Sequence, residues 1–425
     1  MNILMMSNTY LPVVGGLERS IESFTKEYRK RGHRVMIVAP EYENSPKKEF
    51  DVIRVPALQN FYGSKFSVKL PIAGFFLEAL GEFKPDIIHV HHPFLVGDTA
   101  LRLAYDHKVP LVFTHHSLYE ENVGDSETVK KFVTELATGF ANCCDHVIAP
   151  SESVAEIIRT RGVKTQITVV PTGLHLSQYK GTAGKFREES KISKDAFVVG
   201  YVGRLSPEKN LSFLIRAVAV FLKREMEATF LVVGSGPLEA ELVSYFKKQK
   251  LGDRLRLVGE IKGEKLIEAF QAIDVFAFSS RSETQGMVLN EAMAAGTPVV
   301  GLDAPGVRDI VRDKINGRLV VHESEEEFVK ALSWVQKLSL AEKRKLIAGA
   351  KKTAKRFSMQ RCVNNALGLY ESLQPAKNFQ RKSEERDWFP LMQRAEAEWD
   401  LLCNFTKATL GAFASSEENL SEVAL

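Results

Sequence analysis

The chain has 425 residues, well beyond the ~100 to 200 of an ordinary single domain, which predicts two or three domains. Hydrophobic residues make up 44% and charged residues 26%, as in globular proteins, so a disordered or collagen-like chain is excluded. The formal net charge of +4 is small for this length, and we therefore expect no nucleic-acid partner.

No run of about 20 apolar residues occurs, so the sequence predicts no helix that crosses a bilayer. Residues 1–6 have no basic segment before their short apolar run, which indicates a buried strand and not a signal peptide. The chain has neither paired Cys-x-x-Cys ligands nor the cysteine density of a secreted scaffold. Its four cysteines are Cys143, Cys144, Cys362 and Cys403. We expect a cytoplasmic protein, soluble or peripheral to a membrane.

Short apolar runs alternate with longer helical patterns along most of the chain, which predicts parallel sheets covered by helices on both faces. Helical patterns such as 17–31 and 129–142 separate the strands of the first half. The strands predicted there are 2–6, 34–39, 51–55, 87–90, 111–114, 146–149 and 167–170.

A polar stretch, 178–194, follows and is interpreted as a link between domains because it lacks a sustained apolar period. The second series of predicted strands is 197–202, 228–233, 255–258, 275–278, 298–302 and 317–320. This α/β pattern predicts two Rossmann-like domains, 1–180 and 195–358. They are followed by a helix, 359–374, and by a helical tail, 376–425, of unknown role.

The most informative motif contains two glutamates separated by seven residues, Glu283 and Glu291. Glu283 lies in a predicted loop at the carboxyl end of a strand, and Glu291 lies within the helix that follows. The helix start, residues 285–288, offers unpaired backbone N–H groups for a phosphate, and Gly286 permits a close approach. Carboxylates beside an anion site suit a sugar nucleotide. Alternatively, Glu283 is a helix cap and Glu291 is a solvated helix residue.

A second motif places two cations, Arg204 and Lys209, after the first strand of the second domain. Ligands of open α/β sheets bind at the carboxyl ends of the strands, where both cations can converge. An arginine fork and a lysine point charge can stabilise a departing diphosphate without a metal. The alternative is a solvated loop.

Two further segments lie at strand ends of the first domain. Gly15 and Gly16 precede a helix and let the backbone approach a pyrophosphate or a sugar, although a Gly-Gly turn alone is weak evidence. His115 and His116 follow another strand, where histidine can donate to a sugar hydroxyl or contact an acceptor. A second histidine cluster lies nearby, at His89, His91 and His92. A zinc site built from these histidines is not expected, because no His-Glu-x-x-His or cysteine spacing supports it.

Residues 232–239 are similar to a dinucleotide-binding fingerprint, but Glu239 stands where that motif needs a small residue. This weakens a dehydrogenase interpretation. No two aspartates are separated by a single residue, the arrangement with which many transferases hold a divalent metal. We therefore expect a metal-independent reaction that needs no cofactor.

Together these segments resemble the retaining glycosyltransferases of family 4, the glycosyl transferases group 1. The resemblance covers the chain to about residue 374. It implies the GT-B fold, in which two Rossmann-like doubly wound domains face each other across a cleft, with a helical C-terminal extension here. It also implies that the first domain binds the acceptor, that the second binds the nucleotide-sugar, and that helix 359–374 returns to the first domain.

The resemblance further implies roles for individual residues. Arg204 and Lys209 would hold the donor diphosphate, Glu291 the ribose and Glu283 the transferred hexose. The base would lie near Glu260 and Ile261. The remaining donor-binding positions that it implies are Gly15, Gly16, Gln285, Gly286, Met287 and Val288.

Within the family, residues 114–121 are similar to a segment of bacterial enzymes that glucosylate diacylglycerol. His116 would then lie near the sugar and the acceptor oxygen. A possible lipid-binding segment, 60–77, combines Lys65 and Lys69 with several phenylalanines. The alternative is a core helix with solvated lysines. The aromatic residues of the tail, Trp388, Trp399 and Phe405, admit the same two interpretations and also an oligomer contact.

The expected function is transfer of a hexose, glucose from UDP-glucose, to an acceptor hydroxyl with retention of configuration. The acceptor would be a membrane lipid such as diacylglycerol, reached from the inner face of the membrane. The residues expected to be catalytic are Glu283, His116, Arg204 and Lys209. The alternatives are a soluble or other cell-envelope acceptor, a sugar-nucleotide epimerase, and a non-catalytic sugar-nucleotide-binding subunit.

Overall fold

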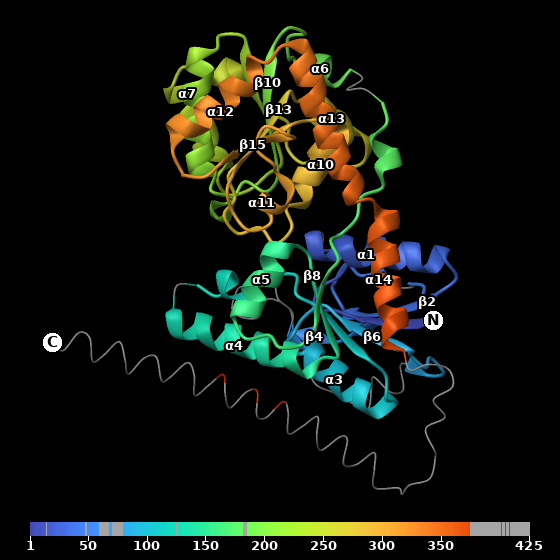
Figure 1. Ribbon diagram of the computed structural model, residues 1–425. Coiled ribbons are helices and arrows are strands. Elements are labelled where there is room, and N and C mark those ends of the chain that lie inside the picture. The colour runs from blue at the N-terminus through green and yellow to red at the C-terminus, as the bar shows by residue number, and fades with distance from the viewer. Residues whose placement is uncertain are drawn as a thin grey trace, which may run out of the picture. The chain divides into compact units, whose positions relative to one another are not determined.

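The chain forms two compact units in a computed structural model (Figure 1). The structure describes residues 1–13, 15–46, 49–58, 68–69, 80–124, 126–181 and 185–374, together with Leu401, Asn404 and Ala408. Unit 1 comprises Met1–Pro171 and Val363–Leu425, and unit 2 comprises Thr172–Cys362. Among the described helices, none is both long enough and apolar enough to cross a membrane.

Unit 1 is built on a seven-stranded parallel sheet with the strand order β3-β2-β1-β6-β7-β8-β9. Strands β6, β7 and β8 are buried along their whole length, as expected where helices cover both faces of a sheet. A short antiparallel pair, β4 (Ala57–Leu58) and β5 (Val68–Lys69), is separate from this sheet. The strands of the main sheet confirm the predicted series and are β1 (Asn2–Met6), β2 (Arg34–Pro40), β3 (Val52–Val55), β6 (Ile87–Val90), β7 (Leu111–Thr114), β8 (His146–Ala149) and β9 (Ile167–Val169).

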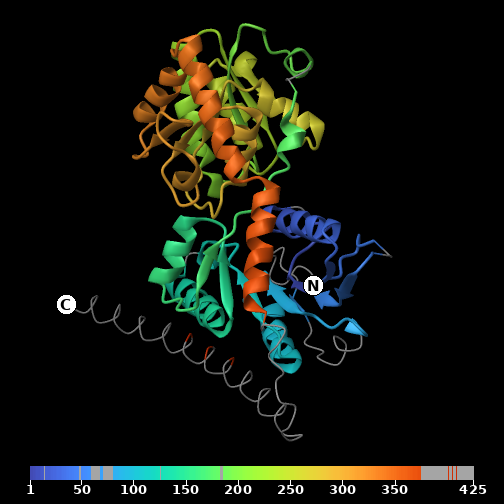
Figure 2. The same cartoon turned by 45° about the vertical axis from the view of Figure 1, so that its right-hand side comes forward.

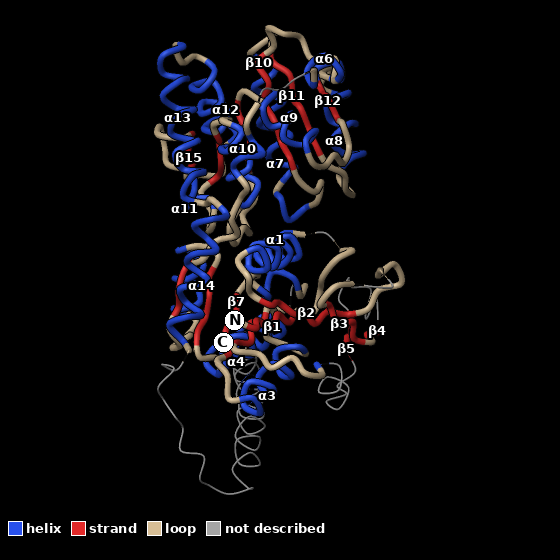
Figure 3. Tube along the Cα trace, turned by 90° about the vertical axis from the view of Figure 1, so that its right-hand side faces the viewer, coloured by secondary structure: helices blue, strands red, loops and turns tan. Residues whose placement is uncertain are grey.

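Helices cover both faces of this sheet. Helix α1 lies on one side and helices α3 and α4 on the other (Figure 2 and Figure 3). Ser126 and Ser151 cap α4 and α5 by accepting hydrogen bonds from backbone N–H groups of the first turn. The described helices of unit 1 are α1 (Gly16–Lys30), α3 (Val96–His107), α4 (Glu127–Cys143) and α5 (Glu152–Thr160), with the 3₁₀ turn η2 (Tyr119–Asn122) and the greater part of α14 (Met359–Leu373).

Unit 2 contains a six-stranded parallel sheet with the strand order β12-β11-β10-β13-β14-β15. Its strands are β10 (Phe197–Val202), β11 (Ala228–Val233), β12 (Leu255–Leu257), β13 (Val275–Phe278), β14 (Val299–Leu302) and β15 (Gly317–Val320). Its helices are α6 (Phe186–Glu189), α7 (Leu211–Arg224), α8 (Glu239–Lys248), α9 (Glu264–Ala272), α10 (Met287–Ala295), α11 (Val307–Ile310), α12 (Glu325–Gln336) and α13 (Leu340–Arg356), with 3₁₀ turns η3 (Leu176–Tyr179), η4 (Pro207–Lys209) and η5 (Gly252–Arg254).

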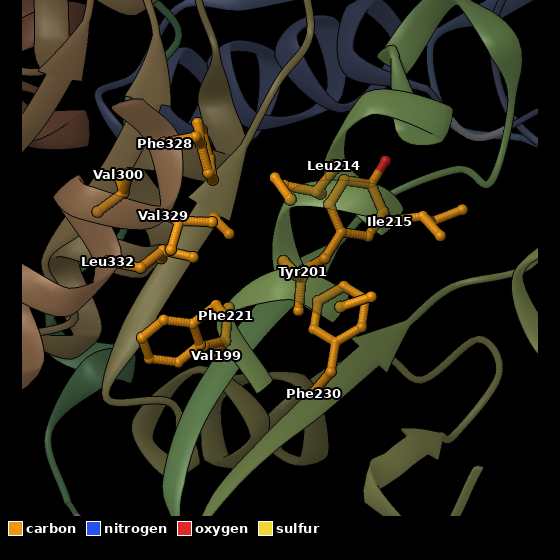
Figure 4. Packing of buried hydrophobic residues seen from close by; sticks show 14 of the residues in the cluster. Val199, Tyr201, Leu214, Ile215, Phe221, Phe230, Val300, Phe328, Val329 and Leu332 are labelled. Atoms are coloured by element: carbon orange, nitrogen blue, oxygen red, sulfur yellow. The ribbon is translucent and has the colours of Figure 1, made fainter. Parts of the chain in front are cut away.

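The sheet of unit 2 has a separate hydrophobic core on each face, because successive side chains of a strand point to opposite sides. In β10, Val199 and Tyr201 pack into the core formed with α7 and α12, which Figure 4 shows from close by. Val198 and Val202, from the same strand, pack into the core formed with α9, α10 and α13. Both cores hold the strand ends rigidly, and the candidate site is built on these ends.

The polar stretch 178–194 differs from its prediction as a link between domains. The boundary between the two units lies at Pro171 and Thr172, and the polar stretch belongs to unit 2. Phe186 and Ile192 are buried in the core beside α9, and Arg187 donates hydrogen bonds to the carbonyl of Ala272 at 2.7 and 3.0 Å. Two isolated apolar anchors produce no periodic pattern, which is why the sequence alone indicated a link.

Candidate active site

Four loops of unit 2 lie side by side at the carboxyl edge of its sheet, and we call them the edge loops. They follow β12, β11, β10 and β13, which are neighbours in that order. The loop after β12 contains Glu260 and Ile261, and the loop after β11 spans 234–238. The loop after β10 carries Arg204 and Lys209, and the loop after β13 carries Glu283. Ligands of open α/β sheets bind at this edge.

Lys209 and Glu283 form an ion pair between two edge loops. The ammonium nitrogen of Lys209 lies 2.6 Å from Oε1 of Glu283, and the two side chains are 26% and 15% exposed. Because β10 and β13 are adjacent, residues that follow these strands meet in space. The structure therefore brings together a cation and a carboxylate that the sequence placed at the same edge.

Two serines that the sequence analysis did not select hold the Lys209 loop against the end of β13. The hydroxyl of Ser279 donates to the carbonyl oxygens of Lys209 and Asn210, each at 3.0 Å. Ser280 donates to the carbonyl of Glu208 at 3.5 Å, and both serines are fully buried. Their signal in the sequence is a pair of small hydroxyl residues directly after an apolar strand. They position the backbone that carries Lys209.

Arg204 is the more exposed of the two predicted cations, with 62% of its side chain accessible. Its contact with Glu208, at 3.8 Å, is a surface pair that contributes little stability, so the guanidinium can turn toward an anion. Burial on its own would raise the pKa of Glu208, but a hydrogen bond from Ser206, a backbone N–H and the charges of Arg204 and Lys209 lower it overall. Glu208 was missed by the sequence analysis.

The fingerprint-like turn at Gly234 and Gly236 supports the Arg204 loop from the neighbouring strand. A Cβ atom at Gly234, where φ is +131°, would lie 2.0 Å from the carbonyl oxygen of Gly203. The backbone N–H of Leu205 donates to the carbonyl of Ser235 at 2.9 Å. The glycines therefore permit a close approach between two protein loops, a structural use of the motif.

Helix α10 begins at the last edge loop and leaves its N-terminus without a side-chain cap. Gly286 adopts a left-handed conformation with φ +69°, which glycine accommodates without strain. The first N–H groups, those of Met287 and Val288, can therefore donate to an anion. Glu291 lies in the second turn of the same helix and is partly buried.

Gln285 is predicted to bind the donor, but its side chain contacts the protein itself. Its Oε1 accepts from the N–H of Thr172 at 2.7 Å, and its Nε2 donates to the carbonyl of Thr172 at 2.8 Å. The side chain is 5% exposed. This reciprocal pair attaches the first residue of unit 2 to the start of α10.

In unit 1, the two predicted glycines lie at the start of α1, with Gly15 as N-cap and Gly16 as the first helical residue. The buried carboxylate of Glu18 accepts a hydrogen bond from the Thr9 hydroxyl, and a Cβ atom at Gly15 would lie 2.6 Å from one of the Glu18 oxygens. A phosphate at this helix end would meet a like charge. The phosphate-binding role of the two glycines stays a prediction.

Histidines at the carboxyl ends of β6 and β7 form a network of ring contacts and hydrogen bonds. His91 Nδ1 lies 2.9 Å from His116 Nε2. His89 contacts the hydroxyl groups of Thr114 and Tyr370, each at 2.6 Å. Burial lowers the pKa of His116 to about 4 and the pKa of His89 to about 3, so both rings are neutral at pH 7.

Among the described His, Cys, Asp and Glu side chains, no group of three or more is arranged to hold a metal ion. The predicted lipid-binding segment 60–77 lies outside the described residues apart from the backbone of 68–69, and Trp388, Trp399 and Phe405 also lie outside them. Near these, Asn404 is described, and its Nδ2 donates to the carbonyl of Leu136 in α4 at 3.1 Å.

Two family models match consecutive parts of the chain. The model for Glycosyltransferase Family 4 matches residues 14–178, and the model for Glycosyl transferases group 1 matches residues 183–353. The chain belongs to glycosyltransferase family 4. This confirms the family that the Glu283 and Glu291 motif indicated.

Curated relatives of this family 4 chain are named for different sugars. The chain is 29% identical to the alpha-monoglucosyldiacylglycerol synthase of Streptococcus pneumoniae over 75% of both chains. It is 25% identical to the enzyme of the same name from Acholeplasma laidlawii, over 78% of this chain and 87% of the relative. It is also 25% identical to a GDP-mannose-dependent alpha-mannosyltransferase of Corynebacterium glutamicum, over 79% of this chain and 80% of the relative.

Solved structures share the fold of this family 4 glycosyltransferase. Anabaena HepE, determined in complex with UDP, superposes with a TM-score of 0.73 at 21% identity over 88% of this chain and 100% of HepE. Sucrose-phosphate synthase from Thermosynechococcus elongatus gives a TM-score of 0.72 at 22% identity over 88% and 98% of the two chains. The predicted GT-B fold is confirmed.

Proposed function

We propose that this glycosyltransferase transfers glucose from UDP-glucose to a hydroxyl of diacylglycerol at the inner surface of a membrane, with retention of configuration. The observation that carries the proposal is the Lys209–Glu283 pair directly before the uncapped start of α10. A cation for phosphate and a carboxylate for sugar hydroxyls lie within one hydrogen bond of each other. The two relatives named as monoglucosyldiacylglycerol synthases support the glucosyl and lipid parts of the proposal.

The donor lies along the edge loops. The base contacts the backbone near Glu260 and Ile261, and the ribose hydroxyls donate to Glu291. The diphosphate binds Arg204, Lys209 and the backbone N–H groups of Met287 and Val288 at the start of α10. The hexose then reaches Glu283, whose carboxylate accepts hydrogen bonds from its hydroxyl groups. Base, phosphates and sugar thus follow the order of the strands β12, β10 and β13.

The reaction exchanges one bond at the anomeric carbon for another. The bond between this carbon and the diphosphate oxygen breaks, and a bond to the acceptor oxygen forms on the same face of the sugar. The departing diphosphate oxygen takes the proton of the acceptor hydroxyl. Arg204, Lys209 and the N-terminal dipole of α10 stabilise the negative charge that develops on the leaving group. No metal is required for this role.

The test is turnover of radiolabelled UDP-glucose by the purified protein with anionic vesicles that contain diacylglycerol. Labelled lipid that depends on Glu283 is the expected result, and the anomeric proton coupling of the product, measured by NMR, should report retention. Glu283→Gln should abolish labelling. Glu326→Gln is the matched control, because it also removes a carboxylate paired with a lysine, in the exposed Glu326–Lys330 pair within α12.

The other possible outcomes separate the alternatives. UDP release without labelled lipid would overturn the lipid acceptor, and use of GDP-mannose in place of UDP-glucose would overturn the donor. The mannosyltransferase relative makes GDP-mannose the second donor to test. Conversion of the UDP-sugar to an isomer without any acceptor would identify an epimerase, and binding without turnover of either donor would identify a non-catalytic subunit.

A further inference from the structure

His91 and His116 share one hydrogen bond, and its direction decides what His116 can do. His91 Nδ1 and His116 Nε2 are 2.9 Å apart. Burial lowers the pKa of both rings, so both are neutral at pH 7, with one protonated and one bare nitrogen each. One ring must donate and the other must accept. The direction of this hydrogen bond therefore fixes which ring nitrogen carries the proton in His91 and in His116.

The second nitrogen of His91 identifies the donor. His91 is 3% exposed, and its Nε2 is buried with no hydrogen-bond partner among the described residues. Buried N–H groups without an acceptor are rarer in proteins than buried acceptors without a donor. The proton of His91 therefore lies on Nδ1, where it donates to Nε2 of His116. Nε2 of His116 is then bare, and the proton of His116 lies on Nδ1.

The neighbouring histidines do not compete for this hydrogen bond. The ring of His89 lies 4.2 Å from the ring of His91, but both of its nitrogens are engaged by Thr114 and Tyr370. Nδ1 of His92 accepts from the backbone N–H of Asn8 at 3.1 Å. His91 therefore has His116 as its hydrogen-bond partner within the described part of the network.

We propose that His91 is a positioning residue that holds His116 in the Nδ1–H tautomer, so that His116 offers a hydrogen-bond donor at the partly exposed end of β7. An Nδ1–H group can bind a hydroxyl or ring oxygen of a substrate, but it cannot remove a proton from the acceptor. This tautomer follows from unit 1 alone. Its use on the sugar or the acceptor rests on the proposed function.

The tautomer is measured directly by ¹⁵N NMR of protein labelled at histidine, because protonated and bare ring nitrogens resonate far apart. Comparison with His116→Gln assigns the signals. In the wild-type protein at pH 7 we expect His116 to show a protonated Nδ1 and a bare Nε2. A protonated Nε2 would overturn the proposal, whether or not the protein transfers glucose.

Variants of His91 test its positioning role. In His91→Leu the signals of His116 should move toward the Nε2–H form, and kcat should fall about two- to tenfold, the effect of one neutral hydrogen bond. His91→Asn retains an amide donor and should restore both readouts. His322→Leu is the control, because His322 is exposed in unit 2. Unchanged His116 signals in a folded His91→Leu protein would contradict the proposal.

Variants of His116 separate a donor from a base. His116→Asn retains an N–H donor but has no basic nitrogen, whereas His116→Leu has neither. A donor role predicts that His116→Asn keeps at least about a tenth of the wild-type kcat and that His116→Leu loses more. Equal losses in the two folded variants would indicate a base and would overturn the proposal. Absence of glucosyl transfer by the wild-type protein would instead contradict the proposed function and leave the NMR result valid.

Discussion

The ammonium group of Lys209 lies 2.6 Å from the carboxylate of Glu283, although 74 positions separate the two residues in the sequence. The adjacency of β10 and β13 produces this contact. Both side chains are mostly buried, so each neutralises a charge that would be costly alone. In the proposed donor complex, the diphosphate and Glu283 therefore compete for the same ammonium group.

This competition predicts opposite effects on the binding of free UDP. Glu283→Gln should bind UDP more tightly than the wild-type protein, because Lys209 is released, while its turnover falls about 100-fold or more. Lys209→Met should lose both affinity and turnover. Isothermal titration calorimetry with UDP measures the affinities. Weaker UDP binding by Glu283→Gln, with Glu326→Gln unchanged, would contradict the competition.

Ser279 should matter more than its neighbour Ser280. Ser279→Ala removes two buried hydrogen bonds of 3.0 Å and leaves the carbonyl groups of Lys209 and Asn210 without this donor. We expect a loss of about 1–3 kcal/mol in the free energy of unfolding and a lower kcat. Chemical denaturation measures the change in the free energy of unfolding. Ser280→Ala, which removes one bond of 3.5 Å, is the matched control, and an equal effect of both variants would refute the assignment.

Gly234 should tolerate no side chain. Gly234→Ala would place Cβ 2.0 Å from the carbonyl oxygen of Gly203 in a backbone conformation that alanine rarely adopts. The loops must separate, so we expect a destabilisation of roughly 2 kcal/mol or more together with weaker UDP binding. Gly252→Ala is the control, because no described atom outside its chain neighbours lies within 4 Å of the added Cβ. Thermal unfolding compares the stability of the two variants, and equal stability would contradict the prediction.

The buried histidines predict that acid destabilises unit 1. Burial lowers the pKa of His89 and His115 to about 3 and that of His116 to about 4, below the ordinary value of 6.5. Below pH 6.5 the unfolded chain binds protons that the folded chain excludes. Each histidine therefore reduces stability by up to about 1.4 kcal/mol per pH unit as the pH falls from 6.5 toward its own folded pKa.

Unfolding measured between pH 7 and pH 4 checks this prediction. The loss of stability toward low pH should be smaller in His116→Gln than in the wild-type protein. His322→Gln is the control variant, because His322 is exposed. A slope equal in the wild-type protein and in His116→Gln would show that His116 is protonated as readily in the folded chain as in the unfolded one.

The sequence was sufficient to predict the strands and the position of Lys209 and Glu283 at one sheet edge. Buried parallel strands are continuous apolar runs, and residues that follow them must lie at the carboxyl edge. Contacts that depend on the lateral order of the strands were not predictable in this way. Ser279 reaches Lys209 because β13 lies beside β10, and His91 reaches His116 because β6 lies beside β7.

Hydrogen bonds from side chains to distant backbone groups were also not predictable from the sequence. The donor-binding role that the family resemblance implies for Gln285 stays a prediction, and its side-chain amide pairs with Thr172. The residues around a glutamine in the sequence do not indicate a hydrogen-bond partner 113 positions away. Phe186 and Ile192 were overlooked for a related reason, since two buried residues in a polar stretch carry no periodicity.

Unit 2 is one continuous piece of chain, whereas unit 1 is assembled from two pieces. The ends of unit 2 are joined by hydrogen bonds from Leu174 to Phe357 and from Met359 to Leu174, at 2.8 and 2.9 Å. Unit 2 therefore has the topology of an inserted domain, whose paired ends favour folding as an excised fragment. Unit 1, by contrast, can complete its fold only after the chain has passed through unit 2 and reached Tyr370, whose hydroxyl lies 2.6 Å from His89 Nδ1.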